Sequence, residues 1–418
     1  MKTLYKVLVI SLIIWIIGFV VHMPLVLQKI VFRSELFHPI YTDFLAYLKS
    51  SISSFGSAEK YLMSNPYFDY PFAYPPLIGF LWLVLTRLTY FCFLMAHIHL
   101  SPELIYSIFY IMYSLFSFIF LLIYFYFIDK TVDTKSKIFL FVMPSLLIYV
   151  IYGWAMLWLA LLMLLIYFLH EKYYFLSGLA LGLMIATNPY SAVLMPLLIY
   201  SIYYERRDQM RHFIGGVFIP LLSYTSLFLN DKSLTLFLER YFPASCLNCS
   251  FLILTSKIGP DYIMPLSYIV TMFFVFLILG LNVKSSCCRR LRELGAKVLL
   301  VITSSILFSI SYLPQYGLIV ASSLLLLARE LRVKIFILLS DVLNASIILL
   351  WFHDLYLRKV LSFLDLGLVF NPWSLNSPVQ WIVQIRNIIQ ITVFLAIASE
   401  ILCLYSKKSY KPISAEKV

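Results

Sequence analysis

Charged residues are scarce in this sequence: they make up 12% of its 418 positions, about half the share of a typical soluble domain. The sequence also lacks a glycine-rich phosphate loop, a histidine pair at metal-ligand spacing, a long polar segment and a convincing internal repeat. The scarcity of charge excludes a soluble globular protein, and the missing repeat counts against a transporter. No acidic cluster indicates a metal site, so we expect no metal and no cofactor.

Hydrophobic residues make up 62% of the chain and aromatic residues 17%, with a mean hydropathy of +0.91. Apolar runs of about 20 residues recur, and a helix of that length crosses the ~30 Å hydrocarbon core of a bilayer. We therefore predict an all-α, multi-pass integral membrane protein with one domain over 1–418, in contact with membrane lipid. The net charge of +12 does not indicate a nucleic-acid partner, because most Lys and Arg lie in short loops between apolar runs.

The apolar runs predict about twelve transmembrane helices. We place them at 4–27, 104–128, 138–152, 154–169, 173–187, 189–203, 213–229, 263–283, 297–314, 316–328, 335–352 and 381–404. With the N-terminus inside, most of the 32 Lys and Arg residues fall on inner segments, as the positive-inside rule requires.

The segment 77–98 is apolar enough to be a further span. Counting it as one would move the basic loop at 129–137, and several later basic loops, to the outer side. We therefore predict a helix that lies on or dips into the membrane surface, begun by Pro75 and Pro76 and interrupted by Arg87. The alternative is a span from which Arg87 snorkels.

The predicted outer loops are long, whereas the inner loops are short and basic. The outer segments run over 28–103, 230–262 and 353–380 and contain many aromatic and acidic residues. Long loops gathered on one side predict that the protein recognises or modifies something there. In the second of them, Cys246 and Cys249 form a C-x-x-C pair that fits either a local disulfide or half of a metal site.

Asp43 lies near the predicted outer end of the first span, in the sequence Tyr-Thr-Asp-Phe at 41–44. An acid at that depth is partly desolvated, which makes its carboxylate a better proton acceptor for a hydroxyl group. Asp43 is therefore the candidate catalytic base. The alternative is a structural role as the N-cap of a helix that begins at Phe44, since Asp is a preferred cap.

Asp69 is a second acidic candidate, which either binds acceptor hydroxyls, orients its loop or stabilises a turn. An anionic leaving group also needs a cation on the outer side. Arg386 stands out because it lies inside a predicted span, where charged groups usually have a partner or a function, although it also fits a side chain that snorkels to the outer surface. The other cations eligible by topology are Arg240, Lys257, His353, Arg358 and Lys359.

Three short motifs follow one another in the first outer segment: Tyr-Thr-Asp-Phe at 41–44, Asn-Pro-Tyr at 65–67 and Phe-Ala-Tyr-Pro-Pro-Leu at 72–77. Together they resemble the first outer loop of the GT-C glycosyltransferases. The nearest pattern is that of the polyprenyl-phosphate-mannose-dependent enzymes, among them the catalytic subunit of GPI mannosyltransferase I and similar prokaryotic mannosyltransferases. The resemblance implies that Asp43 is the base, that Tyr74 shapes the loop and that a surface helix precedes the second span.

Two later turns resemble further elements of the same family. Pro-Gln-Tyr at 314–316 is similar to a motif that contributes to the donor pocket, which implicates Gln315 and Tyr316 in substrate binding. Thr-Asn-Pro-Tyr at 187–190, followed by Leu-Met-Pro at 194–196, resembles the family's Lys-Pro motif. This chain has Asn188 where a Lys is common, which leaves open whether that position contacts phosphate.

The resemblance implies an inverting transfer of a hexose, with mannose ahead of glucose or arabinose, from a polyprenyl (dolichyl) phosphate sugar to a hydroxyl of a glycan or lipid-linked acceptor. Such a reaction needs a base and a cation that stabilises the departing phosphate. It would occur at the outer face of the cell membrane in a prokaryote, or in the endoplasmic reticulum membrane of a eukaryote, facing the lumen. A transporter or flippase for a lipid-linked glycan and a non-catalytic scaffold are the alternatives.

Overall fold

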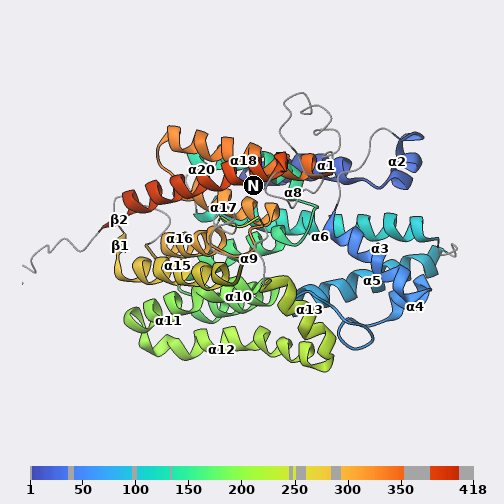
Figure 1. Cartoon of the computed structure of the whole chain (residues 1–418), viewed down its shortest axis with the longest axis horizontal. Helices are drawn as coiled ribbons and strands as arrows, with labels where there is room; N and C mark the ends of the chain where they lie inside the picture. Colours follow the sequence, from blue (N-terminus) through green and yellow to red (C-terminus); the bar gives the residue numbers. More distant parts are fainter. Residues whose placement is uncertain are drawn as a thin grey trace, which may run out of the picture.

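The computed structural model describes residues 2–35, 42–96, 101–131, 134–243, 248–250, 260–283, 293–352 and 377–403. Over these residues the regular structure is helical, except for the two-residue strands β1 (Asn282–Val283) and β2 (Leu402–Cys403), which pair antiparallel, and one isolated bridge. The predicted all-α fold is therefore confirmed. Figure 1 shows the long helices lying roughly side by side, with α3, α4 and α5 at one end of the molecule and the strand pair at the other.

The helices in chain order are α1 (Lys2–His22), α2 (Leu25–Phe32), α3 (Asp43–Phe55), α4 (Ala58–Met63), α5 (Pro76–Ala96), α6 (Pro102–Thr131), α7 (Thr134–Phe141), α8 (Pro144–Tyr149), α9 (Ala155–His170), α10 (Tyr174–Thr187), η1 (Pro189–Val193), α11 (Leu194–Glu205), η2 (Arg207–Gln209), α12 (Met210–Leu221), η3 (Leu222–Leu229), α13 (Asp231–Tyr241), α15 (Pro260–Gly280), α16 (Glu293–Leu307), α17 (Pro314–Leu327), α18 (Leu331–Phe352) and α20 (Pro378–Ile401).

Seven stretches of helix in the described part of the chain are long and apolar enough to cross a membrane: α1, α5, α6, α12 with its flanking 3-10 turns, α15, α18 and α20. Shorter apolar helices are α9, α10 and α17. A multi-pass membrane protein is thus supported, whereas the number twelve is not confirmed. α5 has the length of a span, so its position on the membrane surface stays a prediction.

The segment 138–152 is not the single span that we predicted. α7 ends at Phe141 and α8 begins at Pro144, because a proline has no N–H for the helical ladder and its ring clashes with the preceding turn. α8 ends in turn at Tyr149, and α9 begins only at Ala155. The turn between α8 and α9 contributes to the candidate site described below.

The centre of the helix bundle is formed by α9, α16 and α17, in which nearly every side chain is buried. A helix that is apolar all round belongs inside such a bundle. By contrast, α1, α12 and α15 expose large apolar side chains such as Ile13, Phe218 and Phe273. These exposed faces fit contact with lipid.

Glycines allow α10 and α12 to pack with their backbones in contact. A Cβ atom at Gly178 would lie 2.0 Å from the carbonyl oxygen of Phe213, and one at Gly216 would lie 2.2 Å from the carbonyl oxygen of Phe175. Small residues at such crossings are characteristic of helix pairs in membranes. These two positions therefore have no room for a side chain.

The segment predicted to be the first outer one folds around an aromatic cluster. Phe72 is fully buried, and its ring packs against those of Tyr47, Tyr67, Tyr70, Tyr74 and Trp82. The Tyr67 hydroxyl donates to the carbonyl oxygen of Tyr74 at 2.7 Å. Arg87 donates to the carbonyl oxygen of Leu62 at 2.8 Å, so its guanidinium holds this loop. The cluster thereby fixes where Tyr74 lies.

Candidate functional site

A small pocket lies where the first outer segment meets the ends of α9, α10, α13 and α17. Its volume is about 30 Å³, and it is lined by Asp43, Tyr74, Ile78, Gly153, Trp154, Ala155, Trp158, Thr187, Asn188, Arg240, Tyr241, Gln315 and Tyr316. We call it the Asp43 pocket. Of the predicted site residues, Asp43, Tyr74, Asn188, Gln315 and Tyr316 line it, although they come from four separate parts of the sequence.

Asp43 is the first residue of α3, and its carboxylate faces this pocket. The N-cap of α3 is Thr42, which makes no capping hydrogen bond with its side chain. Asp43 donates its backbone N–H to the carbonyl oxygen of Tyr152 at 3.2 Å, and the Tyr152 hydroxyl donates to the carboxylate at 3.4 Å. Asp43 is therefore not the N-cap, and two hydrogen bonds to the turn before α9 set its position.

Arg240 brings a positive charge to the same pocket. It lies on α13, in the second outer segment, with Nη2 4.0 Å from the Asp43 carboxylate. Its guanidinium also lies over the ring of Tyr74, 4.0 Å from the centroid. Both charged side chains are partly exposed, Arg240 by 33% and Asp43 by 25%. A carboxylate and a guanidinium are thus held within one solvent-reachable site.

Aromatic side chains and amides complete the walls. The rings of Trp158 and Tyr316 meet edge to face at 5.6 Å, and the Trp158 indole N–H donates to the Ser191 hydroxyl at 2.7 Å. Burial raises the pKa of the Tyr241 hydroxyl well above its usual value, so that group stays neutral. Asn188 caps η1 by accepting from the N–H of Tyr190 at 3.0 Å.

Asp69 lies outside the Asp43 pocket, beside a separate groove of about 620 Å³ that also contains Tyr67 and Phe80. Its carboxylate accepts from the backbone N–H of Asn65 at 2.6 Å, and its own N–H donates to the Asn65 carbonyl oxygen at 2.9 Å. These bonds close a turn. The turn-stabilising interpretation of Asp69 therefore fits this geometry.

Arg386 also lies outside the residues that line the Asp43 pocket. Its side chain is fully buried in α20 and does not reach the surface. It donates to the Asn344 side-chain oxygen at 2.8 Å, to the Asn387 side-chain oxygen at 2.7 Å and to the Tyr312 carbonyl oxygen at 3.3 Å. The guanidinium lies 4.0 Å from the centroid of the Tyr312 ring.

This buried network holds two walls of the Asp43 pocket. The Asn344 amide donates to the Pro314 carbonyl oxygen at 2.9 Å, directly before Gln315 and Tyr316. The Tyr149 hydroxyl donates to the Asn344 carbonyl oxygen at 2.8 Å, just ahead of the turn that carries Gly153 and Trp154. The geometry therefore gives Arg386 and Asn344 positioning roles rather than contact with the pocket.

Sequence reasoning missed several residues of the pocket. Trp154, Trp158 and Tyr241 stand in apolar or aromatic runs, where the same residue types usually serve as core. The one local signal in the sequence was Gly153, which lies between the end of α8 and the start of α9 at Ala155, where the pocket begins. The remaining candidate cations, Lys257, His353, Arg358 and Lys359, lie outside the described residues.

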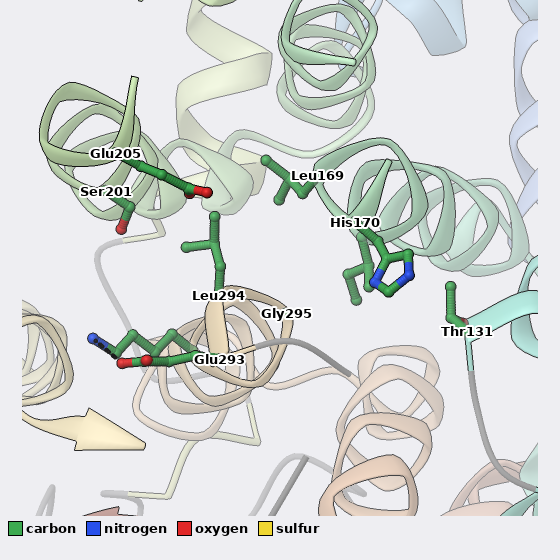
Figure 2. Close-up of a pocket in the computed structure, with 10 residues that line it drawn as sticks. Thr131, Leu169, His170, Ser201, Glu205, Glu293, Leu294 and Gly295 are labelled. Atoms are coloured by element: carbon green, nitrogen blue, oxygen red, sulfur yellow. Dashed lines mark ion pairs between the residues drawn. The ribbon is translucent and has the colours of Figure 1, made fainter. Parts of the chain in front are cut away.

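A second, larger pocket of about 370 Å³ lies at the opposite end of α9. Figure 2 shows Glu205 and Ser201 of α11 across from Glu293 and Leu294 of α16, with His170 of α9 farther along the pocket toward Thr131. All of these residues are in or next to segments predicted to be inner. The Asp43 pocket is thus lined by residues in or next to segments predicted to be outer, and this larger pocket by residues in or next to segments predicted to be inner.

Cys249 is disulfide-bonded, whereas Cys246 lies outside the described residues, so the pairing of the two cysteines with each other stays a prediction. Within the described part of the chain, no group of three or more His, Cys, Asp and Glu side chains is arranged to hold a metal ion. Comparisons with known proteins find no matching family model, curated protein or solved structure.

Proposed function

We propose that the protein is an integral membrane glycosyltransferase with its active site in the Asp43 pocket. It transfers a hexose, mannose by motif resemblance, from a polyprenyl phosphate sugar to a hydroxyl of a glycan or lipid-linked acceptor, with inversion at the anomeric carbon. The observation that carries this proposal is the meeting of Asp43 and Arg240, 4.0 Å apart, in one aromatic-walled pocket.

Asp43 acts as the base in this reaction. The acceptor oxygen forms a bond to the anomeric carbon of the sugar while the bond from that carbon to the phosphate oxygen breaks. The proton of the acceptor hydroxyl passes to the Asp43 carboxylate, and the lipid phosphate leaves with the bonding electron pair. The hydrogen bond from Tyr152 and the backbone bond to the same residue aim the carboxylate into the pocket.

Arg240 stabilises the negative charge that develops on the leaving phosphate. A guanidinium offers two parallel N–H donors to phosphate oxygens, and a preorganised cation lowers the barrier most where charge develops. The guanidinium stacks on the ring of Tyr74, which fixes its position. Arg240 thus supplies the charge that Asn188 cannot supply in place of the Lys common in similar enzymes.

The pocket is small in this structure, although Asp43 and Arg240 are partly exposed. Its volume of about 30 Å³ is far below the roughly 300–1,000 Å³ of most small-molecule sites, so a whole sugar fits inside it only when a wall moves. α13 is the wall that carries Arg240 and Tyr241. It is tied to the first outer segment by the bond from the Phe72 N–H to the Ser233 hydroxyl at 3.0 Å.

The test is a transfer assay with membranes that contain the protein and matched membranes that lack it. Polyprenyl phosphates that carry labelled mannose, glucose or arabinose are supplied with lipid-linked glycan acceptors. We expect one donor to be used, and we expect the product to have the opposite anomeric configuration to the donor. If the configuration is retained, or if no donor is used with any acceptor, the proposed reaction is wrong.

A further inference from the structure

The indole nitrogen of Trp154 is a buried hydrogen-bond donor with no hydrogen-bond partner among the described residues. The side chain is 8% exposed and lines the Asp43 pocket. Other indoles of the protein differ from it: Trp15 donates to the Ser114 carbonyl oxygen at 2.7 Å, and Trp158 to the Ser191 hydroxyl at 2.7 Å. A buried donor left without an acceptor is destabilising, so this exception needs an explanation.

The surroundings of Trp154 hold its ring in one place. The residue precedes the first turn of α9, and its ring meets that of Tyr113 edge to face at 5.2 Å. The Tyr113 hydroxyl donates to the Gly153 carbonyl oxygen at 2.6 Å, and the Tyr113 ring packs on Phe44, 3.9 Å between centroids. The Trp154 ring is therefore held by Tyr113, which in turn packs on Phe44, the residue that follows Asp43.

We propose that Trp154 is a substrate-binding residue that donates its indole N–H to a hydroxyl oxygen of the hexose; this inference rests on the proposed function. Sugar hydroxyls both accept and donate hydrogen bonds. Next to Trp154, the side-chain oxygen of Gln315 lies 3.4 Å from where a Cβ of Gly153 would stand, so the same wall also presents an acceptor.

Charge separates this role from that of Arg240. The departing phosphate is anionic and pairs with the guanidinium, whereas a neutral N–H between aromatic walls suits a neutral hydroxyl. In this proposal the indole N–H of Trp154 has a hydrogen-bond acceptor only when the sugar is bound. The indole N–H thus contributes to recognition of the sugar, whereas the Trp154 ring contributes to packing through its contact with Tyr113.

The test compares Trp154→Phe with Trp158→Phe. Both changes replace a buried indole by a smaller ring and so cost packing, but the first breaks no hydrogen bond to a described residue. We therefore expect it to lower the melting temperature less than the second, and to raise the KM for the sugar donor about tenfold. The second breaks the bond to Ser191, so it lowers the melting temperature. If the wild type is active and Trp154→Phe has the same KM for the sugar donor, the indole N–H does not bind the sugar and the inference is wrong.

Deoxygenated sugar donors identify the hydroxyl that is bound. One analogue should raise KM for the wild type but cause no further rise for Trp154→Phe, since both changes remove the same hydrogen bond. If every analogue affects the two proteins equally, Trp154 does not contact a sugar hydroxyl. Should Trp154→Phe fold poorly, a benzothienylalanine at this position keeps the ring shape, replaces the N–H by sulfur and is tested in the same way. An inactive wild type would instead overturn the proposed function itself.

Discussion

Replacing Arg240 by Gln should abolish most activity while lowering stability by a smaller amount that leaves the protein folded. The ion pair with Asp43 is 4.0 Å long and partly exposed, which is worth about 0–1 kcal/mol. The contact with the Tyr74 ring, also 4.0 Å, adds about 0.5–2 kcal/mol. The loss in the free energy of unfolding should therefore be about 0.5–3 kcal/mol, a fraction of the roughly 5–15 kcal/mol by which folded proteins are stable.

The effect on the reaction should be much larger. Losing a preorganised group that stabilises charge in the transition state typically lowers kcat by about 100- to 1,000-fold. Arg240→Lys keeps the charge but not the planar fork, so it should fall between wild type and Arg240→Gln. Initial rates of sugar transfer, normalised to the amount of protein in the membranes, measure these losses.

Arg207→Gln is the matched control. Arg207 also stacks on a tyrosine, 5.2 Å from the ring of Tyr203, but it lies next to α11, away from the Asp43 pocket. We expect its rate to stay within about threefold of wild type, as for a surface change outside the site. If Arg240→Gln behaves like this control, the leaving phosphate is held by another cation and the assignment of Arg240 is wrong.

Three further predictions concern residues outside the pocket wall. Gly178→Leu should prevent stable folding, because even a Cβ would lie 2.0 Å from the Phe213 carbonyl oxygen; detergent extraction and thermal aggregation measure this. Arg386→Met should cost about 1–3 kcal/mol for each neutral acceptor that it leaves without a donor, among them the side-chain oxygens of Asn344 and Asn387, seen as a lower melting temperature. Asp69→Asn should keep activity within about threefold, because Asp69 closes a turn; a loss as large as that of an Asp43 variant would contradict this role.

The fold class followed from composition, because an apolar chain of this kind has few stable forms other than membrane-spanning helices. The helix ends were harder to predict. Pro144 breaks an apolar run that hydropathy reads as continuous, and α9, α10 and α17 are shorter than a usual span. Hydropathy measures how apolar a run is, and it does not report where the helix within it stops.

The position of Asp43 near Gln315 and Tyr316 was expected only through the motif resemblance, and the structure brings these residues to one pocket. Arg240 was one of several eligible cations, since charge and topology alone do not reveal that α13 folds back over Tyr74. Arg386 looked functional because it is charged at membrane depth, yet its partners are neutral amides and a carbonyl, which the sequence does not place beside it.

The most direct measurement is sugar transfer from polyprenyl-phosphate-mannose by wild type and by Asp43→Asn, at equal expression in the same membranes. The substitution keeps the size of the side chain and removes its ability to take a proton. The proposed reaction predicts transfer by the wild type and a loss of at least about 100-fold in the variant, as expected when a general base is removed. Equal transfer by both would show that Asp43 is not the base, and transfer by neither would favour a flippase or a scaffold.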